Sequence, residues 1–181
     1  DAIIGWKKQT GHSPGIFTWL TINAYRFNDL LHKMRLAGFD TLFIGIESFS
    51  QNSLLETAKV QNLTMELSDA VRHIQSYGFI VVAGLIFGFD SDDASCFEAT
   101  HKGMVKSGLL SGDPALLLAL PGTPLYRRMQ LAGRLRSESY GSTKNYGSNI
   151  RFLLDREIII NGYIEFIKQR NTGRSEFLRL R

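Results

Sequence analysis

The chain has 181 residues, of which 44% are hydrophobic and 21% are charged. These proportions exclude wholesale disorder, because enough apolar surface is present to bury a core. No apolar run is long enough to cross a bilayer, and the first residues do not resemble a secretory signal peptide. The length suits one domain with room for a short appendage.

Basic residues outnumber acidic ones, 21 against 17, and most of the arginines lie toward the C-terminal end. Nucleic-acid binding is one interpretation of such a chain. No basic motif with interleaved aromatic residues precedes that stretch, however. We therefore expect a solvated basic tail and no nucleic-acid partner.

Cys96 is the only cysteine in the sequence. It excludes an internal disulfide, which favours a reducing, cytoplasmic location. A single thiol also cannot form a tetrahedral cysteine zinc site or ligate an iron–sulfur cluster within this chain alone.

One pattern repeats along the chain, namely an amphipathic helix, a glycine that ends it and an almost continuously apolar strand. Strands are predicted over residues 16–23, 41–47, 79–87 and 115–120. Helices are predicted between them, over residues 27–37, 67–77 and 97–105. The apolar stripe of the first of these helices is Phe27, Leu30, Leu31, Met34 and Ala37.

Continuously apolar strands are typical of parallel sheets with both faces covered, and their alternation with helices indicates an α/β fold. Four strands make an open sheet or a partial barrel, whereas a complete triosephosphate-isomerase type barrel needs eight. The pattern ends near residue 134, after which a loop rich in Ser, Gly, Tyr and Asn precedes one more helix near 153–167. We therefore expect a main part at 1–135 and a helical, irregular extension at 136–181.

Parallel α/β proteins place their sites at the carboxyl ends of the strands. Glu47 follows an apolar strand, where an unpaired carboxylate is costly to bury. It could accept hydrogen bonds from ligand hydroxyls, or it could serve a salt bridge or a helix start together with Ser48 and Ser50. Gly84 and Gly88 allow a flat ligand to approach the backbone, or mark a bulge or a tight turn.

Three aspartates, Asp90, Asp92 and Asp93, follow the third predicted strand. They could bind a hard cation, but negative charge at the start of the next helix is the better interpretation. Thr123 and Pro124 suit the N-cap and first position of a further helix. The four histidines are scattered, and no catalytic Ser-His-Asp or Cys-His set can be assembled.

Three motifs follow the predicted strands in order: Phe-Ile-Gly-Ile-Glu-Ser at 43–48, Gly-Leu-Ile-Phe-Gly-Phe-Asp at 84–90, and Leu-Ala-Leu-Pro-Gly-Thr-Pro-Leu-Tyr at 118–126. Together they resemble the fourth, fifth and sixth strands of the radical S-adenosylmethionine (SAM) superfamily. The similarity is greatest to its cobalamin-binding branch with a C-terminal extension, which includes hopanoid-modifying enzymes. Residues 88–92 and 162–163 are typical of that branch.

The resemblance implies an α/β partial barrel of the triosephosphate-isomerase type, of which this chain supplies strands three to six out of six. It places Glu47 near the ribose or amino end of SAM, and Gly84, Ile86 and Leu118 around the adenine. The cofactor-binding residues that it implies are Asn23, Gly45, Glu47, Ser48, Gly84, Ile86 and Leu118.

In that family a reduced [4Fe–4S] cluster cleaves SAM to a 5′-deoxyadenosyl radical, which abstracts hydrogen from the substrate. The three-cysteine cluster motif and the glycine-rich second-strand motif are absent from this chain, and no cobalamin-binding domain is visible. We therefore expect SAM as the cofactor of this part and no metal site. The cluster, and cobalamin if it is used, would belong to the full-length protein. The expected partners are a missing N-terminal part of the same protein and a small-molecule or lipid substrate.

Three functions stay open on the sequence alone. The first is a fragment of a radical SAM enzyme for methylation or rearrangement, and the second is an inactive barrel fragment that serves as a binding or interaction module. The third is an unrelated barrel enzyme, such as an aldolase or hydrolase, with Glu47 as its base. That third function needs a catalytic lysine or a metal-ligand set at the strand ends, and the sequence offers neither.

Overall fold

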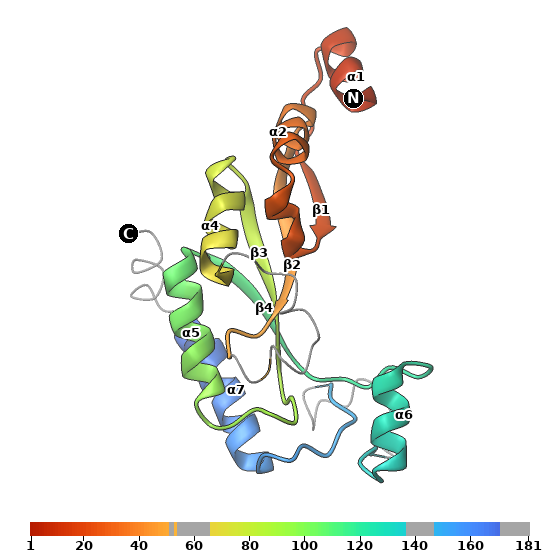
Figure 1. The fold of residues 1–181 in the computed structure, drawn as a ribbon, viewed down its shortest axis with the longest axis vertical. Coiled ribbons are helices and arrows are strands. Elements are labelled where there is room, and N and C mark those ends of the chain that lie inside the picture. The colour runs from red at the N-terminus through yellow and green to blue at the C-terminus, as the bar shows by residue number, and fades with distance from the viewer. Residues whose placement is uncertain (51–52, 54–65, 137–146, 171–181) are drawn as a thin grey trace.

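The structure is a computed structural model, and it describes residues 1–50, 53, 66–136 and 147–170. At its centre is a parallel sheet with the strand order β1-β2-β3-β4 (Figure 1). The strands are Ile16–Leu20, Phe39–Glu47, Ile80–Phe87 and Ser111–Leu116. The predicted parallel order is confirmed, and the strands are joined by helical crossovers as an α/β fold requires.

Helices precede, connect and follow the strands. They are α1 (Ala2–Thr10), the 3₁₀ helix η1 (Ile22–Arg26), α2 (Asn28–Ala37), α4 (Leu67–Ser76), α5 (Cys96–Ser107), α6 (Pro124–Leu131) and α7 (Arg156–Arg170). Gly38 and Gly108 end α2 and α5 in the left-handed conformation, with φ of 104° and 64°, as predicted. The hydroxyl of Thr123 accepts the N–H of Tyr126 at 3.2 Å, which confirms the predicted cap of α6.

The two faces of the sheet differ in exposure. Alternate residues of β2 and β3 are buried in the main core, among them Leu42, Ile44 and Leu85. The helices α4, α5 and α7 lie on one side of the sheet (Figure 1). The opposite face carries Phe17 and Trp19, which are 46% and 69% exposed. We call it the open face; the expectation that strands this apolar are covered on both sides is not met in β1.

The first and last strands end differently from the prediction. β1 stops at Leu20, and the chain turns into η1 instead of extending to residue 23. β4 covers 111–116 instead of 115–120. Beyond Leu116 the chain follows a different path, because Leu117 and Ala119 are buried in a second cluster with Phe89, Met129 and Ile150.

Polar contacts hold the segment after β4 in that second cluster. The side chain of Asn149 accepts the N–H of Ala119 at 2.9 Å and donates to its carbonyl at 2.8 Å. Buried peptide groups need hydrogen-bond partners. The side chain of Asn149 supplies them for Ala119 in place of a neighbouring strand.

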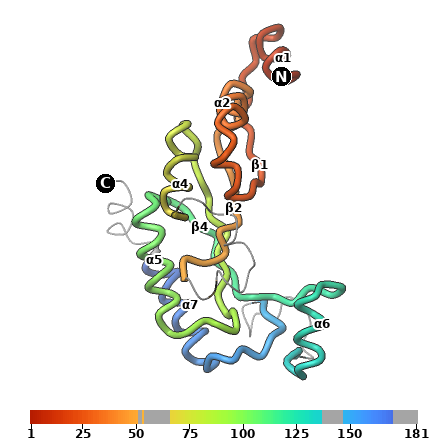
Figure 2. Tube along the Cα trace, in the orientation of Figure 1, coloured from red at the N-terminus to blue at the C-terminus, as the bar shows by residue number. Residues whose placement is uncertain are grey.

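Figure 2 shows an elongated path, with α1 at one end and α6 and α7 toward the other. α7 packs against α5 and contributes Ile159, Tyr163 and Phe166 to the main core. The Tyr163 hydroxyl donates to the carbonyl of Pro114 in β4 at 2.9 Å. Within the described ranges, no helix is both long and apolar enough to span a membrane.

Candidate functional site

Two glycines lie side by side on the central strands. Gly45 of β2 and Gly84 of β3 are register partners. A Cβ added to Gly84 would lie 2.8 Å from Cε1 of Phe43 and 3.6 Å from the Cα of Gly45. The ring of Phe43 therefore occupies the space that a side chain at Gly84 would fill, so Gly84 is buried and the flat surface at this point is aromatic.

Glu47 ends β2 with φ of 69° and is the one non-glycine residue with positive φ among those the structure describes. The register shifts between Gly45 and Glu47, so the bulge lies in β2 rather than at Gly84. The N–H of Ser48 donates to the carbonyl of Ile46 at 2.9 Å, which closes a tight turn around Glu47. Such backbone strain costs about 1–3 kcal/mol and gathers at functional sites.

Ser48 is buried beneath this turn, and its hydroxyl accepts the N–H of Ser50 at 3.0 Å. Its role in the structure is thus to shape the segment after β2. The sequence also allowed Glu47, Ser48 and Ser50 to serve a helix start; such a helix would begin after residue 50, outside the described residues, although residue 53 is helical.

Asn23 lies in η1, just beyond the carboxyl end of β1. Its Oδ1 is buried and has no hydrogen-bond partner within the described part of the chain. A buried acceptor left unsatisfied costs about 1–3 kcal/mol. A ligand N–H or O–H donor would remove that cost.

Ile86 and Leu118 are both half-buried. Ile86 of β3 packs against the second cluster, which contains Phe89, Leu117 and Ala119. Leu118 lies beyond the end of β4 instead of within a strand. Register thus brings Gly45, Glu47 and Gly84 together on adjacent strands, whereas Asn23 and Leu118 belong to segments that follow the two edge strands.

The three aspartates after β3 have separate structural roles. Asp93 accepts the hydroxyl of Ser95 at 2.5 Å and its N–H at 2.8 Å just before α5, and these two hydrogen bonds hold the pKa of the Asp93 carboxyl below its usual value. This agrees with the predicted charge at a helix start. Asp90 instead pairs with Arg134 at 2.6 Å and with Arg128 at 3.5 Å.

Asp92 is buried and organises the turn after β3, a role that the sequence did not indicate. Its carboxylate accepts the N–H groups of Gly88 at 2.7 Å and Phe89 at 3.0 Å, and also the hydroxyl of Ser53. Gly88 has φ of 100°, so the tight-turn interpretation of this glycine is confirmed. In the described ranges, no three His, Cys, Asp or Glu side chains are placed to hold a metal ion.

The Cys96 thiol is buried at the start of α5. Burial, followed by the charges of Asp92 and Asp93, raises the pKa of this thiol to about 12. Cluster ligation needs several exposed thiolates, so the residues of this chain do not fit an iron–sulfur cluster.

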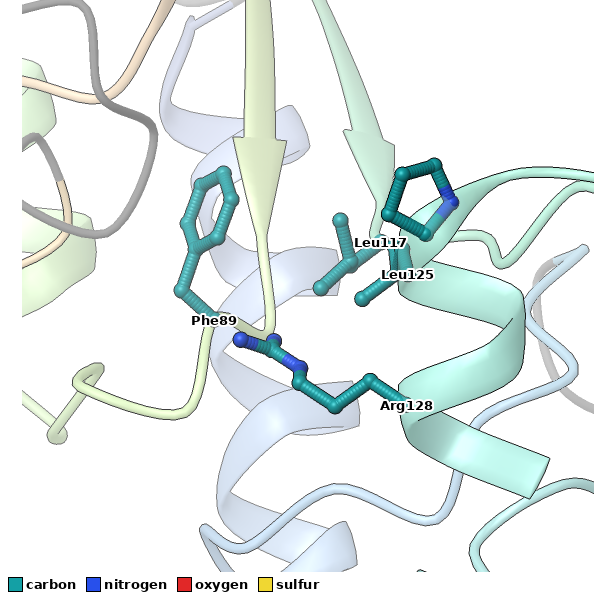
Figure 3. A pocket seen from close by; sticks show the side chains of 5 residues that line it. Phe89, Leu117, Leu125 and Arg128 are labelled. Carbon is teal, nitrogen blue, oxygen red and sulfur yellow. The ribbon is translucent and has the colours of Figure 1, made fainter. Parts of the chain in front are cut away.

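A pocket of about 270 Å³ opens at the carboxyl ends of β3 and β4. Phe89, Leu117, Pro124, Leu125 and Arg128 line it, and Figure 3 shows the Arg128 side chain extending from α6 toward Phe89. The sequence motifs at 84–90 and 118–126 contain Phe89, Pro124 and Leu125 but not Leu117 or Arg128, which do not stand out by type or spacing.

The chain is similar in sequence and in fold to known methyltransferases. No family model matches the chain. The chain is 34% identical over 158 residues to a hopanoid C-2 methylase of Rhodopseudomonas palustris, covering 87% of this chain and 29% of that protein. It is 30% identical over 162 residues to an uncharacterized methyltransferase of Synechocystis sp., covering 88% of this chain and 30% of the relative.

The fold matches the radical S-adenosylmethionine methyltransferase TsrM of Kitasatospora setae, whose structure contains cobalamin and a [4Fe–4S] cluster. The TM-score is 0.65 over 96% of this chain and 40% of TsrM. The chain is thus similar in sequence to a hopanoid C-2 methylase and similar in fold to a radical SAM methyltransferase. The likeness to TsrM concerns the fold alone, because the sequences are 12% identical. The chain spans less than a third of the length of either curated relative named above.

Proposed function

We propose that the chain is part of a radical SAM methyltransferase and that it supplies part of the SAM site. The observation that carries this proposal is the 34% identity to a hopanoid C-2 methylase across 87% of the chain. The fold shared with TsrM supports it independently. In this proposal β1 to β4 are strands three to six of a six-stranded partial barrel, residues 1–135 are the barrel part and 136–181 are the extension.

The open face would hold the nucleoside of SAM. The ring of Phe43, which packs over Gly84, would offer the adenine a flat aromatic surface. Gly45 and Gly84 would supply the backbone beside it, with Ile86 and Leu118 as apolar neighbours. Glu47 would accept hydrogen bonds from the ribose hydroxyls, and the buried Oδ1 of Asn23 would accept one further donor. Ser48 would shape the turn that presents Glu47.

The remaining cofactors and partners follow from the relatives. Since the single buried cysteine does not fit a cluster, a cluster and cobalamin would be held by residues outside this sequence. The substrate would be a small molecule or a lipid, and the similarity to a hopanoid C-2 methylase makes a hopanoid one example. A cytoplasmic location and the absence of a nucleic-acid partner stay predictions.

One observation favours a second function for the chain by itself. Its only thiol is buried and neutral, so it cannot ligate the cluster on which radical chemistry depends. A binding or interaction module that retains the nucleoside site without catalysis is the alternative. Both functions predict SAM binding, and only the first predicts methyl transfer when the chain is part of the longer protein.

Equilibrium titration of SAM into the chain tests the site. Glu47→Gln keeps the shape of the side chain and removes its charge, so it should weaken binding by about 1.5–3 kcal/mol, the range for hydrogen bonds to a charged group. Glu157→Gln, on the exposed side of α7, is the matched control and should bind as wild type does. Equal affinity of a folded Glu47→Gln variant and wild type would remove Glu47 from the site.

A further inference from the structure

The pocket at the ends of β3 and β4 has no occupant in the function proposed above. We propose that it binds the apolar part of the methyl-accepting substrate, and that Arg128 selects substrates in which a small anionic group lies next to that part. Calling the ligand the substrate rests on the proposed methyltransferase function. Binding of an apolar anion by the pocket stands on its own geometry.

The walls of the pocket set the size and polarity of the ligand. Phe89, Leu117, Pro124 and Leu125 make it largely apolar (Figure 3). A cavity of about 150 Å³ is enough for benzene. The 270 Å³ found here therefore suits one or two fused rings or a short branched chain.

Charge at the rim sets the sign of the polar group. Asp90 lies 2.6 Å from Arg134 and 3.5 Å from Arg128, so one carboxylate contacts two guanidinium groups and lies nearer to Arg134. The Arg134 side chain is 15% exposed and is also held by the carbonyl of Arg151 at 2.8 Å. Arg128, at 49% exposed, makes the longer contact and lines the pocket. A guanidinium in this position suits a carboxylate or a phosphate.

The position of the pocket fits a methyl acceptor. Ile86, which we assign to the adenine, packs against the cluster that includes the pocket residues Phe89 and Leu117. The pocket thus adjoins the proposed SAM site at the carboxyl edge of the sheet. Methyl transfer requires such adjacency, because donor and acceptor must be held in contact.

Titration of the 181-residue chain with two matched probes, 2-naphthoate and 2-naphthamide, tests the proposal. Both carry two fused rings, and only the naphthoate is charged. Methyl NMR signals of Leu117 and Leu125 should shift in a saturable way with each probe, and the naphthoate should bind more tightly by roughly threefold to tenfold, as a partly exposed charged contact allows. Absence of saturable shifts at these two leucines would overturn the proposal.

Variants distinguish binding in the pocket from a general effect of positive charge on the surface. Arg128→Gln should lower the affinity for naphthoate to that for naphthamide, whereas Arg127→Gln, its exposed neighbour outside the pocket lining, should change neither. Leu125→Trp should block both probes by filling the pocket. An equal loss in the two arginine variants would sink the selective role of Arg128. SAM titration of Arg128→Gln keeps the two proposals apart, because we expect SAM binding to persist there whatever happens to the probes.

Discussion

Glu47 combines a strained backbone with the position that we propose for ribose binding. A φ of 69° at a non-glycine residue is uncommon, and here it follows from the bulge and turn that end β2. A sequence free of functional demands would place glycine or asparagine at such a point. The strain therefore argues that the carboxylate itself is needed.

Two substitutions at position 47 measure that strain. Glu47→Gly and Glu47→Ala both remove the carboxylate, but only glycine adopts the left-handed conformation without steric cost. We expect the glycine variant to unfold at higher urea concentration, with a free energy of unfolding about 1 kcal/mol above that of the alanine variant. Both should bind SAM more weakly than wild type. Equal stability of the two variants would show that position 47 is not strained.

Cys96 should be chemically inert in the folded chain. Burial beside Asp92 and Asp93 raises the pKa of its thiol to about 12 from a usual value of 9.0, and the thiolate is the reactive form. At about pH 8, below the usual thiol pKa, reaction with a disulfide reagent should therefore proceed only after unfolding, as absorbance of the released thiol would report. Rapid labelling of the native chain would contradict the burial.

The same thiol makes stability fall at alkaline pH. Above pH 9.0 the unfolded chain loses the Cys96 proton while the folded chain keeps it, so the unfolded state binds fewer protons and the free energy of unfolding decreases with pH. The loss should continue until the pH approaches about 12. Cys96→Ala should remove this part of the pH dependence in urea titrations.

At the scale of elements, two helical glycines have opposite surroundings. A Cβ at Gly162 of α7 would lie 2.2 Å from the ring of Phe97 on α5, whereas a Cβ at Gly5 of α1 would meet nothing within 4 Å. Alanine in a helix gains about 1 kcal/mol over glycine, but overpacking a core costs about 1–3 kcal/mol.

We therefore expect Gly5→Ala to be neutral or stabilising and Gly162→Ala to be destabilising by about 1 kcal/mol after its propensity gain. Thermal unfolding followed by circular dichroism measures both. If Gly162→Ala raised the melting temperature as much as Gly5→Ala, the close approach of α5 and α7 would be wrong.

Helix ends and strand order could be read from the sequence because their causes are local. A glycine after an amphipathic stretch ends a helix whatever the rest of the fold does, as at Gly38 and Gly108. The buried side of a helix is less local: Leu31 of α2 is fully buried, while Leu30, in the same predicted stripe, is 45% exposed. The position of β4 also escaped prediction, because Asn149, 30 residues away, satisfies the backbone of Ala119.

The candidate site likewise combines features with local causes and features that depend on contacts between elements. Glu47 and Gly84 can be proposed from the sequence because they lie at or near the ends of apolar strands. The bulge that strains Glu47 and the salt bridges that position Arg128 depend on residues from other elements, such as Asp90 and Leu85. No spacing rule along the chain reports contacts of that kind.

At the scale of the whole molecule, α7 ties the expected extension to the main core. Ile159, Tyr163 and Phe166 are buried there, and Phe166 packs edge-on against Phe87 with ring centroids 5.0 Å apart. Burying one such side chain stabilises a fold by roughly 1.5–3 kcal/mol, so three amount to much of the roughly 5–15 kcal/mol that a domain possesses.

A chain ended at residue 135 should therefore lose cooperative unfolding in urea, followed by circular dichroism. Phe166→Ala in the full chain should cost about 3–5 kcal/mol and retain a cooperative transition. A shortened chain that unfolds with the midpoint of the full chain would establish 1–135 as independently stable.

The open face of the sheet also carries an intrinsic fluorophore, a tryptophan side chain. The chain has two tryptophans, and Trp19 lies on β1 with its ring centroid 6.5 Å from that of Phe43, whose ring packs over Gly84. Trp6 lies apart, in α1. Replacing Trp6 with phenylalanine leaves Trp19 as the only indole. Its side chain is 69% exposed, and the wavelength of its fluorescence emission depends on that exposure. A ligand that binds on this face would shield the indole from water and shift its fluorescence emission to shorter wavelength, so binding could be followed without an added dye.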